Sequence, residues 1–267
     1  MNEAWLSRLQ GRLAQAPAQP RAVLELAWPD LAAAAVIGSI EPALASRMAR
    51  AGLPLREAGE AWRIAASSES GVDSALAAIA QWLRENDLAA AWRDELLPVT
   101  DALGASLGRI ERAAVRPLGI VTQAAHLVAT DARGQVWVQQ RAFDKATDPG
   151  LWDTTMGGLV SAGESITQTL ARETWEEAGL RVVDLVGLAT MGRLTVRRPV
   201  AEGYMVEHIT VFEAVVPPGQ VPVNQDGEVD RFECLQLAEL MVRLHADEFT
   251  LEAAMILATW LERRAGL

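Results

Sequence analysis

Residues 158–180 read GLVSAGESITQTLARETWEEAGL, and this stretch decides how the rest of the chain is interpreted. Ser165 is a good helix N-cap, and Gln168, three residues later, completes a capping-box pattern. The stretch therefore predicts a helix over residues 165–178. Gly157 and Gly158 precede this helix, and such glycines let a backbone approach a metal ion or a phosphate group closely.

Three glutamates of the predicted helix lie on its apolar side. At about 100° per residue, Glu173, Glu176 and Glu177 continue the face that begins at Ile166. An acidic face exposed to solvent would lie opposite the apolar face of the helix. Carboxylates that are buried together repel one another unless cations compensate their charge. Arg172 offsets only part of this charge. The pattern therefore favours a divalent metal with hard oxygen ligands, Mg²⁺ or Mn²⁺, over an exposed, salt-bridged helix end.

The same stretch can be written as residues at fixed spacing: Gly158, five residues, Glu164, seven residues, Arg172-Glu173, two residues, Glu176-Glu177, one residue, Gly179, then Leu180. This spacing resembles the Nudix box at every defining position. The resemblance implies an α/β/α sandwich with a mixed sheet and hydrolysis of a diphosphate linked to another moiety. It also implies roles for single residues: Glu173 and Glu177 as metal carboxylates, Glu176 as a further ligand or a water-polarising group, the Gly158 carbonyl as a backbone ligand, and Arg172, paired with Glu164, as the residue that orients the glutamates.

The base that accepts a proton from water often lies outside this box in the families that it resembles. Glu228, in the run Asp226-Gly227-Glu228-Val229, is the first candidate for such a distal carboxylate, and a solvated loop is the competing interpretation. Glu207, on a predicted strand, is the second candidate.

A second motif precedes the box and narrows the resemblance. Arg141, Lys145, Pro149-Gly150, Asp153 and Gly157-Gly158 form the run RxxxKxxxPGxxDxxxGG. It is similar to the branch that holds isopentenyl diphosphate isomerase and the thiamine-pyrophosphokinase-related hydrolases. The isomerase needs a cysteine shortly before the box, and residues 153–156 read DTTM. Isomerase chemistry is therefore not expected.

The N-terminal part of the chain strengthens the hydrolase interpretation. The run VIGSI at residues 36–40 and the run WRDELLPV at residues 92–99 resemble the accessory domain that precedes thiamine-pyrophosphokinase-related Nudix domains. The resemblance implies hydrolysis of thiamine diphosphate and of its oxo- and oxythiamine analogues to the monophosphate and phosphate. The alternatives are a Nudix pyrophosphatase for ADP-ribose or another nucleoside diphosphate derivative, and a non-catalytic Nudix ligand-binding regulator.

Several side chains are candidates for substrate contacts. Lys145 is the only lysine in a chain that otherwise uses arginine, which favours a phosphate contact over a chance surface lysine. Arg141 fits a second phosphate contact or a structural residue at a strand end. Trp92 and Trp152 can stack on a flat heteroaromatic ring, with core packing as the alternative, and Trp175 is expected to pack.

The rest of the chain predicts a smaller α+β domain over residues 1–117 and a Nudix domain over residues 118–267. Helices are expected over 3–16, 43–50, 73–86, 165–178, 237–245 and 250–264, and strands over 36–40, 119–130, 136–141, 182–190, 204–216 and 232–235.

Composition excludes several classes of function. The 267 residues include 24 basic and 35 acidic ones, a net charge of −11, which disfavours nucleic-acid binding and adhesion to anionic membranes. Cys234 is the single cysteine, so neither an intramolecular disulfide nor a cysteine-cluster metal site is expected. His126, His208 and His245 show no ligand spacing and are interpreted as core or surface residues. A cytoplasmic enzyme with a small-molecule partner is the expectation, and the oligomeric state stays open.

Overall fold

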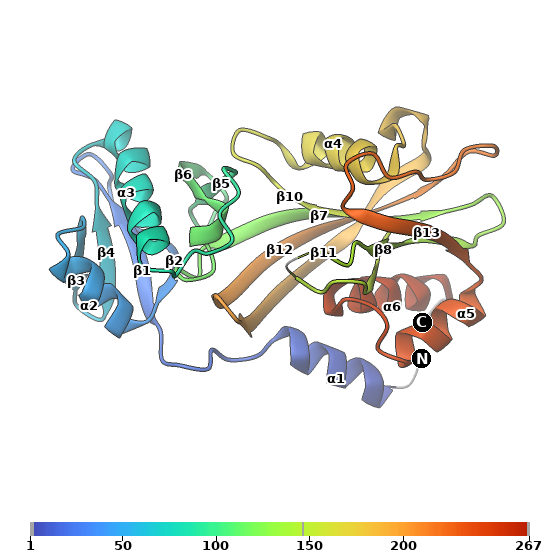
Figure 1. Ribbon diagram of the computed structural model, residues 1–267, viewed down its shortest axis with the longest axis horizontal. Helices are drawn as coiled ribbons and strands as arrows, with labels where there is room; N and C mark the ends of the chain where they lie inside the picture. The colour runs from blue at the N-terminus through green and yellow to red at the C-terminus, as the bar shows by residue number, and fades with distance from the viewer. Residues whose placement is uncertain (1–2, 146, 266–267) are drawn as a thin grey trace.

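The computed structural model describes residues 3–145 and 147–265. Its N-terminal part is built on a four-stranded mixed sheet in the order β2-β1-β4-β3 (Figure 1). The parallel β1–β4 pair lies at the centre of this sheet, and the two outer pairs are antiparallel. The strands are β1 (Ala22–Ala27), β2 (Ala35–Ile40), β3 (Leu55–Ala58) and β4 (Ala61–Ala65).

Two helices and a hairpin complete this part of the molecule. Helices α2 (Pro42–Arg50) and α3 (Val72–Glu85) bury apolar faces, and β5 (Leu96–Thr100) pairs with β6 (Ser106–Glu111). Short 3₁₀ turns, η1 (Glu69–Gly71) and η2 (Arg112–Ala114), precede α3 and follow β6. Together these elements enclose one hydrophobic core, which includes Ile64, Leu76 and Ile110.

The larger part holds a seven-stranded mixed sheet. Its main path runs β11-β12-β7-β8-β13, with β10 paired to β7 and β9 paired to β8. The β12–β7 pair is parallel, and the other pairs are antiparallel. The strands are β7 (Val121–Thr130), β8 (Val136–Arg141), β9 (Trp152–Asp153), β10 (Met156–Leu159), β11 (Val186–Val200), β12 (Gly203–Val215) and β13 (Val229–Leu235), and the turn η3 (Val182–Asp184) precedes β11.

Helices cover both faces of this sheet. Helix α4 (Ile166–Ala178) packs on one face through a core that includes Leu127, Leu170 and Phe212. Helices α5 (Leu237–His245) and α6 (Leu251–Ala265) lie on the opposite face (Figure 1). Helix α1 (Glu3–Leu13) joins that second core, because Trp5, Leu9 and Leu13 are buried in it.

The structure confirms the predicted fold class: an α/β sandwich with a mixed sheet follows an additional α+β region. The hairpin over residues 121–141 and the helices α2, α3, α4, α5 and α6 lie within about two residues of their predicted positions. Two expectations were wrong. The first helix ends at Leu13 rather than at residue 16, and the strand expected over 182–190 is a 3₁₀ turn followed by the longer β11.

The boundary between residues 117 and 118 stays a prediction. The segment around it is fastened to both parts of the molecule, since the Ser39 N–H donates to the Leu118 carbonyl and the Tyr204 N–H donates to the Arg116 carbonyl, each at 3.0 Å. Among the described residues, no helix has the length and apolar character needed to cross a bilayer.

Candidate active site

Local sequence fixes the helix that carries the glutamates. The Ser165 side chain accepts from the Gln168 backbone N–H, and the Gln168 side chain accepts from the Ser165 N–H, so the predicted capping box is present. Gly179 ends α4 in the left-handed conformation, with φ of 60°, which a glycine adopts without steric cost. Strand β10 lies beside the helix and brings Gly157 and Gly158 to its glutamates.

Glu177 is the most deeply buried carboxylate of the box, with 1% of its surface exposed. Its Oε2 atom accepts from the Gly157 N–H and from Gln139 Nε2, each at 3.0 Å. The Lys145 ammonium lies 3.8 Å from Oε1. Burial raises the pKa of Glu177 to about 8 in spite of Lys145, and the neighbouring charge of Glu173 raises it further. An ionised Glu177 therefore calls for more positive charge than these side chains provide.

Arg172 organises the other acids of the box. Its Nε donates to Glu164 at 2.8 Å, and its Nη1 donates to Glu173 at 2.7 Å and to Glu176 at 3.0 Å. The predicted pairing of Arg172 with Glu164 is therefore present. The hydrogen bonding of Arg172 to Glu164 lowers the pKa of the Glu164 carboxyl group. Burial raises the pKa of Glu173 to about 6. A Cβ atom at Gly158 would overlap the Glu173 carboxyl group, so the absence of a side chain there makes room for it.

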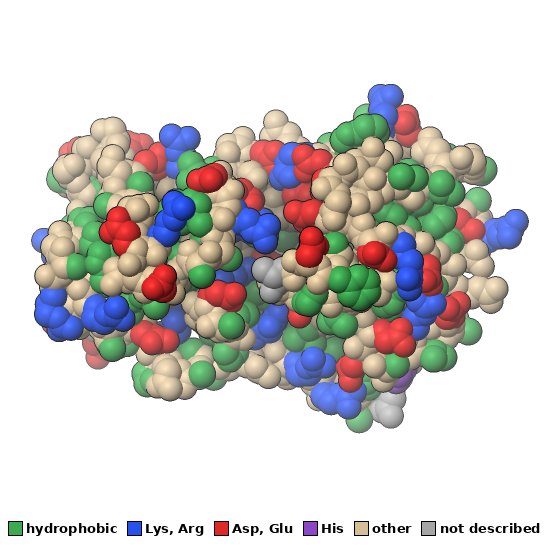
Figure 2. Space-filling view, in the orientation of Figure 1, with side chains coloured by type: hydrophobic (Ala, Val, Ile, Leu, Met, Phe, Trp, Pro, Cys, Tyr) green, Lys and Arg blue, Asp and Glu red, His purple; other side chains and the backbone are tan. Residues whose placement is uncertain are grey.

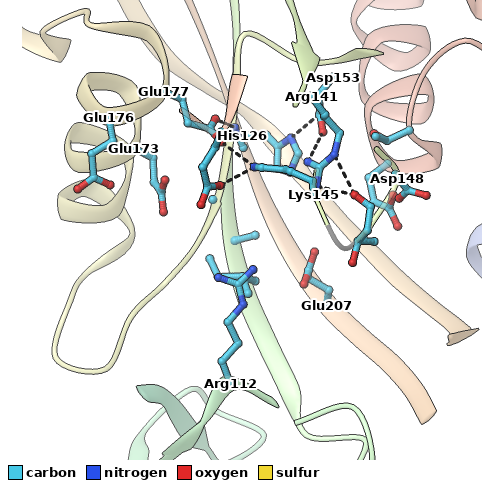
Figure 3. Close-up of a pocket in the computed structure, with 18 of the residues that line it drawn as sticks. Arg112, His126, Arg141, Lys145, Asp148, Asp153, Glu173, Glu176, Glu177 and Glu207 are labelled. Atoms are coloured by element: carbon cyan, nitrogen blue, oxygen red, sulfur yellow. Dashed lines mark hydrogen bonds and ion pairs between the residues drawn. The ribbon is translucent and has the colours of Figure 1, made fainter. Parts of the chain in front are cut away.

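These residues line a cavity of about 550 Å³. Figure 3 shows the Lys145 side chain directed at Glu177 within it, with Arg112 extending toward both from the N-terminal part. The Lys145 ammonium also lies 2.5 Å from Glu228 Oε2. Burial would raise the pKa of Glu228, but the hydrogen bond and charge of Lys145 hold it below its ordinary value. The structure thus brings both predicted candidates, Lys145 and Glu228, to the box.

Another part of the cavity wall holds two ion pairs whose glutamates are buried. Arg116 lies 3.0 Å from Glu207, whose Oε2 also accepts from Thr122 at 2.9 Å. Arg198 lies 3.1 Å from Glu252. Glu207 was the second candidate for a distal carboxylate, and it does line the cavity. The other members of this wall carry no local sequence signal, because only the folded sheet brings residues 116, 198, 207 and 252 together.

His126 is a cavity residue that the sequence did not single out. Its Nδ1 atom lies 2.9 Å from the Thr154 hydroxyl, which donates to the Met156 carbonyl at 2.8 Å. Because that hydroxyl proton is used, Nδ1 carries a proton and donates to Thr154. A Cβ atom at Gly157 would meet the imidazole ring, so this glycine makes room for His126 as Gly158 does for Glu173.

Other predicted contacts have different positions. The Arg141 guanidinium is bonded to the Thr147 carbonyl and to Asp153, the arrangement of a structural strand-end residue, although it lines the cavity. Trp152, a candidate for stacking on a ligand ring or for core packing, is 5% exposed in the core beneath Arg231 and Arg243, outside the cavity lining. Trp92 lies beneath Arg84 at a separate hollow. Trp175, expected to pack, is 51% exposed.

The residues present fit a divalent cation by the chemistry of their donor atoms. Hard carboxylate oxygens suit Mg²⁺ or Mn²⁺, and the carboxylates of Glu173 and Glu177 remain incompletely compensated by cations of the chain. In the described ranges, no three acidic, imidazole or thiol side chains are already gathered as metal ligands, because Glu173 and Glu176 are turned to Arg172.

Comparison with known proteins agrees with this geometry. The NUDIX domain family matches residues 121–256, about half of the chain, so the chain belongs to this family. It is 30% identical over 152 residues to Nudix hydrolase 24, chloroplastic, of Arabidopsis thaliana, covering 55% of this chain and 42% of that protein. It is 31% identical over 159 residues to an isopentenyl-diphosphate Delta-isomerase of Streptomyces avermitilis, covering 58% of this chain and 78% of that protein.

Among solved structures, the DR0079 protein of Deinococcus radiodurans is similar with a TM-score of 0.48 and 21% identity, over 58% of this chain and 92% of that one. The chain spans only about half, or less, of the length of the curated Nudix relatives that it matches. In three of them the matched region covers 42%, 52% and 41% of the relative.

Proposed function

We propose that the chain is a divalent-metal-dependent hydrolase that cleaves a diphosphate linkage. One observation carries this proposal: Glu177 is buried at the cavity wall, bound by the Gly157 N–H, within reach of Lys145 and beside Glu173. A carboxylate so placed is costly unless a cation joins it. Membership of the NUDIX family and the relatives named Nudix hydrolase support the same chemistry.

The side chains divide into three tasks. Glu173, Glu176 and Glu177, with the Gly158 carbonyl, would hold Mg²⁺ or Mn²⁺, and Arg172 fixes the position of the first two carboxylates. A bound divalent ion neutralises the diphosphate and lowers the pKa of a coordinated water. Lys145 binds a phosphate oxygen of the substrate. Glu228, kept ionised by Lys145, accepts the proton of the attacking water.

The proposed substrates are thiamine diphosphate and its oxo- and oxythiamine analogues, cleaved to the monophosphate and phosphate. Two features of the sequence support this branch of the family: the run from Arg141 to Gly158, and the motifs at residues 36–40 and 92–99. The run at residues 92–99 contributes Glu95 to the cavity lining, so the N-terminal part takes part in forming the pocket.

The similarity to an isopentenyl-diphosphate isomerase makes isomerisation the natural rival. Thr154 and Thr155 occupy the stretch where the isomerase is expected to carry its cysteine, and both are buried. Cys234 lies on β13, outside the cavity lining, and burial raises the pKa of its thiol to about 11. Neither position offers a reactive thiolate, which supports hydrolysis.

Product identification tests the proposal. The 267-residue protein is incubated with Mg²⁺ and thiamine diphosphate, oxothiamine diphosphate, oxythiamine diphosphate, ADP-ribose or dGTP. Release of monophosphate and phosphate from the thiamine compounds, with the nucleotides intact, is the expected result. Cleavage of nucleotides alone would contradict the thiamine assignment and retain diphosphate hydrolysis. Lack of turnover on every compound would favour a ligand-binding regulator.

A further inference from the structure

The cavity described above is strongly acidic for a site that accepts an anion. Among its described lining residues, eleven are Asp or Glu and six are Lys or Arg. A diphosphate that enters this cavity is repelled unless metal ions and accessible cations of the chain compensate it. The basic residues that remain accessible to a ligand are therefore the ones that matter for its binding.

Arg112 is the most accessible of the six basic side chains. It is 38% exposed, whereas the others, Arg116, Arg141, Lys145, Arg172 and Arg198, are between 16% and 30% exposed. Its ion pair with Glu95 uses one nitrogen, Nη1, which lies 2.7 Å from the Glu95 carboxylate. A guanidinium has donors on Nε and Nη2 as well, so Arg112 can bind an anion while it keeps Glu95.

The backbone around Arg112 is held in place. Glu111, which is 4% exposed, accepts from the Arg93 N–H at 3.0 Å and caps the turn η2 that Arg112 begins. The Arg112 N–H donates to the Glu95 carbonyl at 2.8 Å. The guanidinium therefore projects from a fixed turn of the N-terminal part, and Figure 3 shows it directed toward Lys145 and Glu177.

The hairpin that carries this turn is also fastened to the box. The Ala162 N–H, between Gly158 and α4, donates to the Leu96 carbonyl at 2.8 Å. Leu159, which follows Gly158, packs against both the N-terminal core and the core on the α6 face. The distance between Arg112 and the glutamate helix is thus set by direct contacts, as the position of a binding residue requires.

We propose that Arg112 is an anion-binding residue of the active site, contributed by the N-terminal part, and that its guanidinium binds a phosphate oxygen of the diphosphate ligand. The identity of this ligand rests on the proposed function. Arg112 extends toward the box from the N-terminal part, whereas α4 carries the glutamates, so it and the metal-binding face hold the diphosphate from two sides. This gives the N-terminal part a direct role in substrate binding.

Binding of methylenediphosphonate, a diphosphate that resists hydrolysis, tests the proposal. Its Kd is measured by calorimetry with Mg²⁺ for the wild-type chain, Arg112→Ala, Arg112→Lys and Arg109→Ala. Arg109 is a matched control, because it lies on the same hairpin and pairs with Asp73 at 2.8 Å, away from the cavity. Equal Tm values and circular dichroism spectra establish that each variant is folded.

The expected result is a Kd at least about tenfold higher for Arg112→Ala, a smaller loss for Arg112→Lys and an unchanged Kd for Arg109→Ala. A Kd for Arg112→Ala within about twofold of the wild type would overturn the proposal. An equal loss in Arg109→Ala would also overturn it, because the effect would then be one of net charge.

The outcome is separable from that of the proposed function. A wild type that binds methylenediphosphonate but cleaves no diphosphate contradicts the hydrolase proposal, while the Arg112 series still decides the binding role. A wild type that fails to bind methylenediphosphonate overturns the Arg112 proposal, while product identification still decides the hydrolase proposal.

Discussion

The Gly157 N–H donates a 3.0 Å hydrogen bond to the carboxylate of Glu177, which joins strand β10 to the last turn of helix α4. Gly157 pairs with His126 across β10 and β7, so one backbone position connects the sheet, the imidazole and the buried glutamate. This connection explains why a glycine pair precedes the helix. The first residue makes room for His126, and the second makes room for Glu173.

Substitution of Gly158 tests that spatial requirement. In Gly158→Ala the new methyl group overlaps the Glu173 carboxyl group, which is the movable end of a side chain, so we expect the fold to persist and Glu173 to shift. The expected result is a kcat lower by about tenfold or more and a higher Mg²⁺ requirement. Gly192→Ala is the control, because nothing lies within 4 Å of a Cβ atom there. Equal kcat values for the two variants would contradict this account of Gly158.

Lys145 provides a test of phosphate binding from the box side. Its ammonium lies between Glu228 and Glu177, and Lys145→Met removes the charge while it keeps much of the side-chain length. We expect KM to rise by about tenfold with a smaller change in kcat. Arg133→Met, an exposed cation of the β7–β8 turn, should leave both constants unchanged. A KM for Lys145→Met equal to that of the wild type would remove Lys145 from the substrate contacts.

Glu207 gives a prediction for stability against pH. Burial opposes its ionisation, but the charge and hydrogen bond of Arg116 hold its pKa below the ordinary value. A depressed folded-state pKa stabilises the protein above the unfolded-state pKa of about 4.3, and this stability is lost as the pH falls through the folded-state pKa. The Tm advantage of the wild type over Glu207→Gln should therefore be full at pH 6 to 7 and shrink below about pH 4. A difference in Tm that does not change across this range would show that Glu207 does not act through its charge.

Much of the box was predictable because its signals are local. The capping residues, the helical face of the three glutamates and the Arg172–Glu164 spacing are all contained in 23 residues, and the structure shows each of them in place. The hairpin of β7 and β8 was also predictable, because alternating residues flank a turn. These features depend on neighbours in sequence, so tertiary packing had little to change.

The rest of the site depends on contacts between distant segments. Arg112, Arg116, His126 and Glu252 have no motif, and they meet only when the two sheets and α6 are assembled. Trp152 lies in the core, because β9 turns its ring away from the cavity lining. Strands β1 and β4 were missed because short, alanine-rich runs give a weak β signal, and β5 contains Pro98, which disfavours an interior strand.

The central claim, that the glutamate face of α4 is a hydrolytic centre, is tested most directly by kcat of Glu177→Gln on the best substrate of the panel, with Tm measured alongside. Glutamine keeps the shape and removes a charge that burial disfavours, so the fold should persist. The account predicts a kcat lower by about 10³-fold or more at an unchanged or higher Tm. Near-normal turnover by Glu177→Gln would contradict it.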